Sequence, residues 1–203
     1  MRALILVDLQ NDFCKGGALE VKNGDAAIPI ANLLMPKFDI VVATQEWHPA
    51  NHGSFAANHL WRKPGQEIDL LGLQQVLSTL HCVQNSFGAM FHKALNTEGV
   101  YKIIQKGTDP KVDSYSGFFD NGRRKQTDLH DYLSSKDVNA VYVMGLTTDY
   151  CVKFTAMDSV SLGYKTYLIE DGSWGMNLTE GDAAKAILEM KKVGVKIIQS
   201  SEI

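Results

Sequence analysis

Three reactive side chains stand where apolar runs of the chain end. Asp8 lies at the end of "ALILVDL", Lys106 closes "YKIIQK", and Cys151 follows "NAVYVMG" after a short turn. In a doubly wound α/β sheet, ligands bind beyond the carboxyl ends of the strands, so we expect the three groups at one edge. A thiol, an amine and a carboxylate there can perform nucleophilic catalysis, with the carboxylate as base and later as acid.

The thiol is expected in the first turn of a helix, within "GLTTDYCVKF". A helix N-terminus stabilises a thiolate, and a nearby Lys106 would add to this, so the sequence predicts a lowered pKa for Cys151. Taken singly, Asp8 could cap a turn, Lys106 could be a solvated strand end, and Cys151 could be a small buried hydrophobe. The three together favour a catalytic site.

A His-rich segment, residues 45–66, interrupts the apolar pattern. Glu46 and His48 are two residues apart in "TQEWHPANH", so both point to one side if the segment is extended. A carboxylate and an imidazole placed in this way can share one metal ion. His52, close in sequence, and His81, in "LHCVQNS", are further candidate ligands. The remaining histidines are predicted to be surface or hydrogen-bonded residues: His59, His92 and His130.

The elements that must position these residues alternate in type. Continuous apolar runs rich in Val and Ile are typical of strands buried on both faces of a parallel sheet. They cover residues 3–9, 39–44, 101–106, 139–145, 165–171 and 195–200. Helix-like segments cover residues 23–38, 127–136, 149–163 and 179–194, the last with Thr179 as its expected N-cap and Gly194 at its end. The alternation predicts an open α/β domain with right-handed crossovers.

Composition narrows the class of protein. The 203 residues fit one domain, and a formal net charge of −3 gives no electrostatic footprint for nucleic acid or an anionic membrane. No apolar stretch is long enough to span a bilayer, and the N-terminal apolar run is too short for a signal peptide. The three cysteines are odd in number and fit no zinc module, which argues against disulfides and for a cytoplasmic protein.

Five stretches resemble one family in both sequence and order. They are "LVDLQNDFCKGGAL", "TQEWHPANHGSFA", "HCVQNS", "KVDSYSGFFDNGR" and "VMGLTTDYCVKFTA". They resemble the nicotinamidases (pyrazinamidases) of the isochorismatase-like hydrolase superfamily, over most of the chain. The resemblance implies one α/β domain, residues 1–203, with a six-stranded parallel sheet in a Rossmann-like three-layer arrangement. It also implies hydrolysis of nicotinamide to nicotinate and ammonia, a step in NAD salvage, with pyrazinamide as a second substrate.

The resemblance assigns roles to particular positions. The family's catalytic triad falls on Asp8, Lys106 and Cys151, and its oxyanion amides fall on Thr147 and Cys151, with a cis peptide before Thr147. Residues that contact the substrate ring fall on Phe13 and Tyr115. The family's metal ligands fall on Glu46, His48 and His81, with His52 as a fourth ligand or a neighbour of bound water. One divalent ion is implied, zinc ahead of iron or manganese, and the number of subunits, including a homo-oligomer, stays open.

The chain departs from the family at three positions. Glu46 stands where the family has Asp, Ser78 stands where it has Trp, and Trp174 replaces a smaller or basic residue. These departures bear on metal affinity and on the substrate pocket.

Three other functions are alternatives to a nicotinamidase. They are an amidohydrolase for carbamoyl or ureido compounds, which would lack the metal motif, an isochorismatase, which works without the nucleophilic cysteine, and a non-catalytic binding domain. A thiol redox protein would need a resolving cysteine near Cys151.

Overall fold

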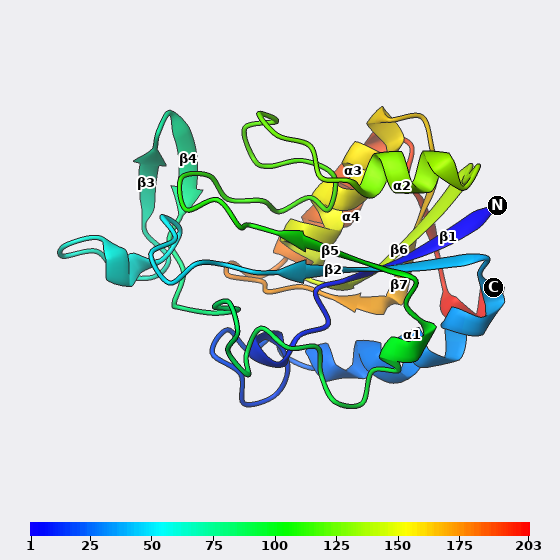
Figure 1. Cartoon of the computed structure of the whole chain (residues 1–203), viewed down its shortest axis with the longest axis horizontal. Helices are drawn as coiled ribbons and strands as arrows, with labels where there is room; N and C mark the ends of the chain where they lie inside the picture. The colour runs from blue at the N-terminus through cyan, green and yellow to red at the C-terminus, as the bar shows by residue number, and fades with distance from the viewer.

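The computed structural model describes residues 1–203, and its centre is one six-stranded sheet (Figure 1). The strands lie in the order β5-β2-β1-β6-β7-β8, and all neighbours are parallel. Their bounds are β1 Arg2–Val7, β2 Ile40–Glu46, β5 Lys102–Lys106, β6 Ala140–Leu146, β7 Lys165–Trp174 and β8 Lys196–Ile198. The six predicted strands and the predicted parallel sheet are confirmed.

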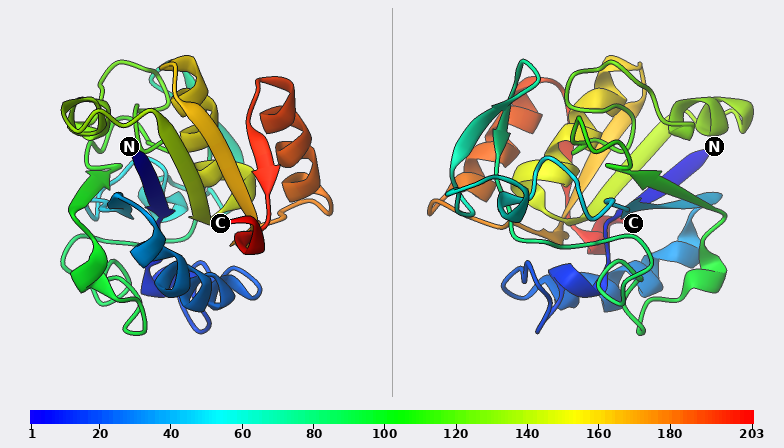
Figure 2. Two further views of the ribbon diagram at one scale, coloured as in Figure 1. Left: turned by 90° about the vertical axis from the view of Figure 1, so that its right-hand side faces the viewer. Right: turned by 60° about the vertical axis from the view of Figure 1, so that its left-hand side comes forward.

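Helices cover both faces of this sheet (Figures 1 and 2). Helix α1 lies against one face, and α2, α3 and α4 lie against the other. Their bounds are α1 Ala27–Leu34, α2 Leu129–Ser135, α3 Lys153–Ser161 and α4 Asp182–Lys192. In the central strand β1, Leu4 and Leu6 belong to the cluster around α1, whereas Ile5 and Val7 belong to the cluster around the other helices. A strand that is apolar on both sides requires cover on both faces, which explains the three layers.

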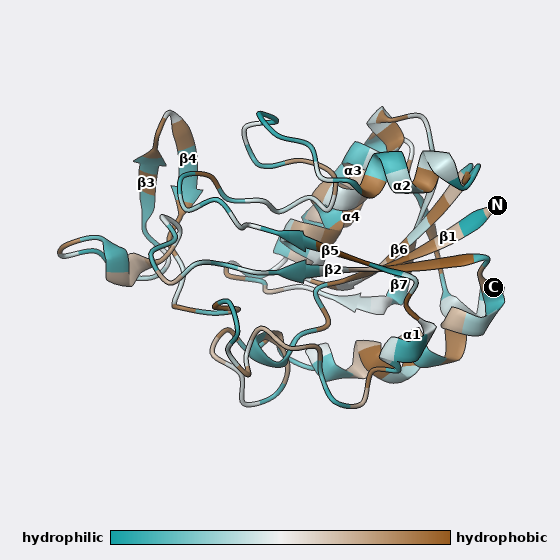
Figure 3. Ribbon diagram, in the orientation of Figure 1, coloured by the Kyte–Doolittle hydropathy of each residue, from teal (hydrophilic) through white to brown (hydrophobic).

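The hydropathy pattern changes along the strands (Figure 3). The body of β2 is hydrophobic, but the carboxyl ends of β2 and β5 are hydrophilic. The residues at these two ends are Glu46 and Lys106, which are also partners in the strand register. Charged groups therefore lie at the edge of the sheet where the sequence places the site. None of the helices is long and apolar enough to cross a membrane.

A second, smaller sheet stands beyond this edge (Figure 1). It is an antiparallel hairpin of β3 (Glu67–Leu70) and β4 (Leu73–Val76), which pair only with each other. The turn residues Leu71 and Gly72 have φ of 53° and 86°, the left-handed conformations that two-residue hairpin turns require. The sequence did not predict this hairpin.

Two helix starts differ from the predictions. Helix α4 begins at Asp182 behind Gly181, whose φ is 91°, and Thr179 does not cap it with its side chain. Instead the backbone N–H of Thr179 donates to the Asp182 carboxylate, so the acidic side chain organises the turn. Cys151 lies in a π-helical turn, Thr148–Val152, ahead of α3 rather than in the first turn of an α-helix. The predicted helix end at Gly194 is confirmed by its φ of 103°.

Candidate active site

Asp8 follows the last residue of β1 in a left-handed conformation, with φ of 51°. Its side chain is fully buried, and Oδ1 accepts a hydrogen bond of 2.6 Å from the Thr44 hydroxyl on β2. The other oxygen, Oδ2, has no partner except the ammonium of Lys106 at 2.9 Å. One oxygen is thus fixed by the scaffold, and the other faces the charged centre of the site.

Lys106 is the last residue of β5 and is 2% exposed. Besides Asp8, its Nζ lies 3.0 Å from Glu46 Oε1, 3.0 Å from the Ser114 carbonyl and 3.3 Å from Cys151 Sγ. Burial disfavours the charged amine, yet the surrounding negative groups, Asp8 first, raise the pKa of Lys106 well above its usual value. This cation therefore stays charged and holds the acidic groups around it.

Cys151 is brought to the same point by the π-helical turn after β6. Its Sγ lies 3.3 Å from Lys106 Nζ and 3.4 Å from Glu46 Oε1. Burial raises the pKa of the Cys151 thiol well above its usual value, and Lys106 only partly opposes this because Asp8 and Glu46 are also close. The prediction of a lowered thiol pKa is therefore wrong for this arrangement. With one cation among three acidic groups, the Cys151 thiol keeps its proton until a base accepts it.

Asp8 is in a position to be that base. Burial raises the pKa of its carboxyl, and the negative charge of Glu46 raises it further, against the pull of Lys106. The acidic atoms of Asp8, Glu46 and Cys151 all lie within 4.8 Å of one another. The sequence predicted that Asp8, Lys106 and Cys151 would meet at one sheet edge, and the structure brings them together there.

A second cluster lies directly beside this one. Glu46 Oε2 lies 3.1 Å from His48 Nε2 and 2.9 Å from His81 Nε2. The opposite ring nitrogens are engaged elsewhere, His48 Nδ1 with the Gly107 carbonyl at 2.8 Å and His81 Nδ1 with the Thr79 carbonyl at 2.9 Å. Carbonyl partners place a proton on each Nδ1, so each Nε2 is the nitrogen that faces Glu46 and that can bind a metal ion when the ring is neutral. One carboxylate oxygen and two imidazole nitrogens fit a divalent transition-metal ion.

His52 lies next to this cluster, with its ring centroid 4.4 Å from that of His48. Its Nδ1 accepts the backbone N–H of Ser54 at 3.2 Å, and burial lowers the pKa of its ring. A neutral ring whose Nδ1 accepts carries its hydrogen on Nε2. That Nε2 is buried and has no partner within hydrogen-bond distance, although the Val112 backbone lies near the ring. His52 therefore presents a donor, rather than a lone pair, from its free nitrogen.

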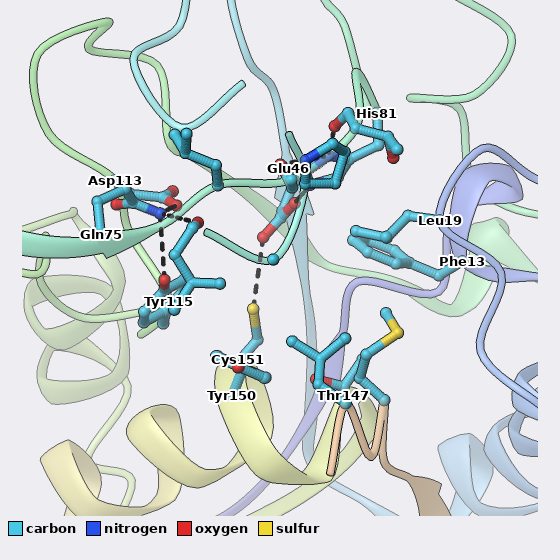
Figure 4. Close-up of a pocket in the computed structure, with 18 residues that line it drawn as sticks. Phe13, Leu19, Glu46, Gln75, His81, Asp113, Tyr115, Thr147, Tyr150 and Cys151 are labelled. Atoms are coloured by element: carbon cyan, nitrogen blue, oxygen red, sulfur yellow. Dashed lines mark hydrogen bonds and ion pairs between the residues drawn. The ribbon is translucent and has the colours of Figure 1, made fainter. Parts of the chain in front are cut away.

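A cavity connects the two clusters (Figure 4). Cys151 lies at its floor, Glu46 and His81 lie above it, and Phe13 and Tyr115 stand on opposite sides. Phe13 is buried, and its ring packs edge-on against His81 with centroids 5.6 Å apart. The cavity can therefore hold a small planar molecule between two aromatic side chains, with one end at the thiol and the other at the imidazoles.

Other predicted positions have mixed outcomes. Thr147 lines the cavity, and the Leu146–Thr147 peptide is cis, as the resemblance implied. Ser78 also lines the cavity. Trp174 does not line it but packs against the core cluster around α1, so its size does not shape the pocket.

Sequence reasoning missed several lining residues, which come from the hairpin, from the loop after β5, from the π-helical turn after β6 and from other segments. They include Gln75, Asp113 and Tyr150. Tyr150 precedes Cys151 directly, and its ring lies 5.4 Å from that of Tyr115. The one sequence feature that could have indicated Tyr150 as a lining residue is its position next to Cys151. No local signal marked Gln75.

The fold and the site together define a cysteine hydrolase built on an open parallel sheet, and comparison with known proteins gives its family. The model of the isochorismatase domain matches residues 2–202, so the chain belongs to the isochorismatase domain family. It is 50% identical to the nicotinamidase of Escherichia coli (strain K12), over 97% of this chain and 93% of that protein.

Solved structures agree with this assignment. The nicotinamidase and pyrazinamidase of Acinetobacter baumanii superimposes with a TM-score of 0.96 at 43% identity, covering 99% of this chain and 97% of that one. The pyrazinamidase of Pyrococcus horikoshii, solved in complex with zinc, superimposes with a TM-score of 0.80 at 39% identity, covering 98% of each chain.

Proposed function

We propose that this chain is an amidohydrolase that converts nicotinamide to nicotinate and ammonia in NAD salvage and also accepts pyrazinamide. The observation that carries the proposal is the pairing of two clusters in one cavity. A thiol with a carboxylate and a buried ammonium lies beside one carboxylate and two imidazoles. The family and the 50% identical nicotinamidase of Escherichia coli support the choice of substrate.

In the first half of the reaction, Asp8 accepts the proton of the Cys151 thiol. The thiolate attacks the carboxamide carbon, a C–S bond forms, and the carbonyl oxygen becomes an oxyanion. The backbone N–H groups of Thr147 and Cys151 donate to that oxyanion. Lys106, between Asp8 and Cys151, stabilises whichever of the two is negative at each stage.

In the second half, the C–N bond breaks and Asp8 gives its proton to the leaving amine, which departs as ammonia. A thioester between Cys151 and the nicotinoyl group remains. Asp8 then accepts a proton from a water molecule, whose oxygen attacks the thioester carbon. Nicotinate leaves, and the sulfur of Cys151 recovers the proton.

Glu46, His48 and His81 would hold one divalent metal ion, with zinc favoured by the oxygen and nitrogen donors. When bound, the ion would act as a Lewis acid toward the pyridine nitrogen, and the residues that hold it would thereby orient the ring. His52 stands beside these ligands rather than among them, because its Nδ1 already accepts a hydrogen bond. Phe13 and Tyr115 pack on the ring from the two sides.

An amidohydrolase for carbamoyl or ureido compounds is the second candidate, but such a substrate has no ring nitrogen for the second cluster.

We place the enzyme in the cytoplasm, because all three cysteines are free and a reducing compartment keeps them so.

Ammonia release measured on a small panel of amides tests the proposal. Nicotinamide and pyrazinamide should release ammonia, and benzamide, which lacks the ring nitrogen, should be a poor substrate. A chelator should reduce the rate, and added zinc should restore it. Release from ureido compounds but not from nicotinamide would contradict the proposal.

A further inference from the structure

The β3–β4 hairpin forms one wall of the cavity, although it belongs to no larger sheet. A two-stranded hairpin on its own is at best marginally stable in water. Every residue of its strands is exposed or half-buried except Gln75, which is 3% exposed. The hairpin is thus docked at one fully buried residue, and that residue is polar.

Burying a side-chain amide costs free energy unless the amide is hydrogen-bonded, and the Gln75 amide is hydrogen-bonded. Its Nε2 donates to Asp113 Oδ2 at 3.1 Å and to the Tyr115 hydroxyl at 3.3 Å (Figure 4). It also lies 2.9 Å from the Val76 carbonyl. Both distant partners lie on the loop after β5, about forty residues further along the chain, so Gln75 joins two separate segments of the cavity wall.

Each distant partner of Gln75 is linked through one further residue to a group that does the chemistry. Asp113 also accepts the backbone N–H of Ser114, whose carbonyl accepts a hydrogen bond from Lys106. Tyr115 packs against Tyr150, the neighbour of Cys151. The contacts of Gln75 therefore lead both to the ring-binding side of the cavity and to the buried ammonium.

We infer that Gln75 is a positioning residue that fixes the hairpin against Asp113 and Tyr115, and so sets the shape of the ring-binding side of the cavity. This inference rests on the proposed function for its kinetic consequence. It concerns substrate binding more than the chemical step, because Gln75 has no contact with Cys151 or Asp8 among its hydrogen bonds.

Gln75→Met tests the inference, since it keeps the length of the side chain and removes all its hydrogen bonds. The KM for nicotinamide should rise about tenfold, the factor that corresponds to the net loss of about one buried hydrogen bond, with a smaller change in kcat. In the absence of substrate, the backbone amides of residues 67–76 should exchange with deuterium faster than in the unsubstituted protein.

The neighbouring residue gives a matched control. Gln74 has the same side chain on the exposed side of β4, and its Nε2 donates to Glu67 within the hairpin. An exposed polar pair contributes little to stability, so Gln74→Met should leave both KM and exchange unchanged.

A pair of substitutions distinguishes positioning from a general loss of stability. Gln75→Glu places a carboxylate against Asp113 and should raise KM further. Adding Asp113→Asn supplies an amide donor for the new carboxylate and should recover a large part of the loss. Unchanged KM and unchanged exchange in Gln75→Met would overturn the inference, as would a double variant no better than Gln75→Glu. Because exchange is measured without substrate, these outcomes are separate from a failure of the unsubstituted protein to release ammonia.

Discussion

Glu46 and Lys106 lie side by side at the ends of β2 and β5, with Glu46 Oε1 3.0 Å from Lys106 Nζ. The second oxygen of the same carboxylate faces the imidazoles of His48 and His81. One side chain therefore joins the two halves of the site. An aspartate, which the resemblance implies at this position, is one methylene shorter and has less reach to span both, so this contact depends on the length of the Glu46 side chain.

Cys151→Ala should abolish ammonia release and leave the fold and metal content intact, because only the nucleophile is lost. Mass spectrometry during slow turnover should detect a nicotinoyl adduct on Cys151 of the unsubstituted enzyme. Cys14→Ala is the control, since Cys14 is buried in the other core cluster and does not line the cavity. Substantial turnover by Cys151→Ala would exclude covalent catalysis.

Glu46→Ala and His48→Ala should each lower metal affinity by at least about a hundredfold, because each removes one of three donors. Elemental analysis after dialysis against a weak chelator measures this directly. His59→Ala should keep full occupancy, since His59 bonds only the Gly53 carbonyl. Full occupancy and an unchanged KM in Glu46→Ala would mean that the histidines hold the ion without it.

The parallel sheet could be predicted because its strands are continuous apolar runs, and the parallel topology then brought Asp8, Lys106 and Cys151 to one edge. The state of the thiol could not be predicted in the same way. It depends on how many charges lie within a few ångströms, and the contact between Glu46 and Lys106 becomes visible only once β2 and β5 are paired.

The hairpin was missed for a different reason. Its strands have four residues each, and one of the eight is buried, so no periodic pattern marks them. Gln75 is buried because Asp113 and Tyr115 meet it from a distant part of the chain. The start of α4 was misplaced because Thr179 has the residue type of a cap, whereas the turn is organised by Asp182.

The acid-side fall in kcat/KM should have its midpoint at a pH above the usual aspartate pKa of about 3.9. Asp8 accepts the thiol proton only when ionised, and burial raises the pKa of its carboxyl. Below that raised pKa the protonated form dominates, so kcat/KM falls as pH falls. A pH profile of kcat/KM measures the limb. Asp8→Asn should lose most activity at every pH, and an unchanged acid limb in that variant would assign the limb to another group.

Ser78→Trp should narrow the range of substrates. Ser78 lines the cavity at a position where the resemblance implies a larger aromatic residue, and its hydroxyl lies 3.4 Å from His81 Nδ1. An indole at this position fills space beside the ring-binding site and adds aromatic surface for a flat substrate. Nicotinamide should bind as well or better, whereas a bicyclic amide such as quinoline-3-carboxamide should lose about tenfold or more in kcat/KM, because overpacking excludes the second ring.

The ratio of kcat/KM for the two amides isolates this effect from any general loss of activity. Ser78→Ala is the matched control, since it removes the hydroxyl but adds no volume, and it should leave the ratio unchanged. If Ser78→Trp also leaves the ratio unchanged, the second ring lies elsewhere in the cavity and position 78 does not set the substrate range. Equal losses for both amides would show that the indole disturbs His81 and the metal cluster instead of the space beside the ring.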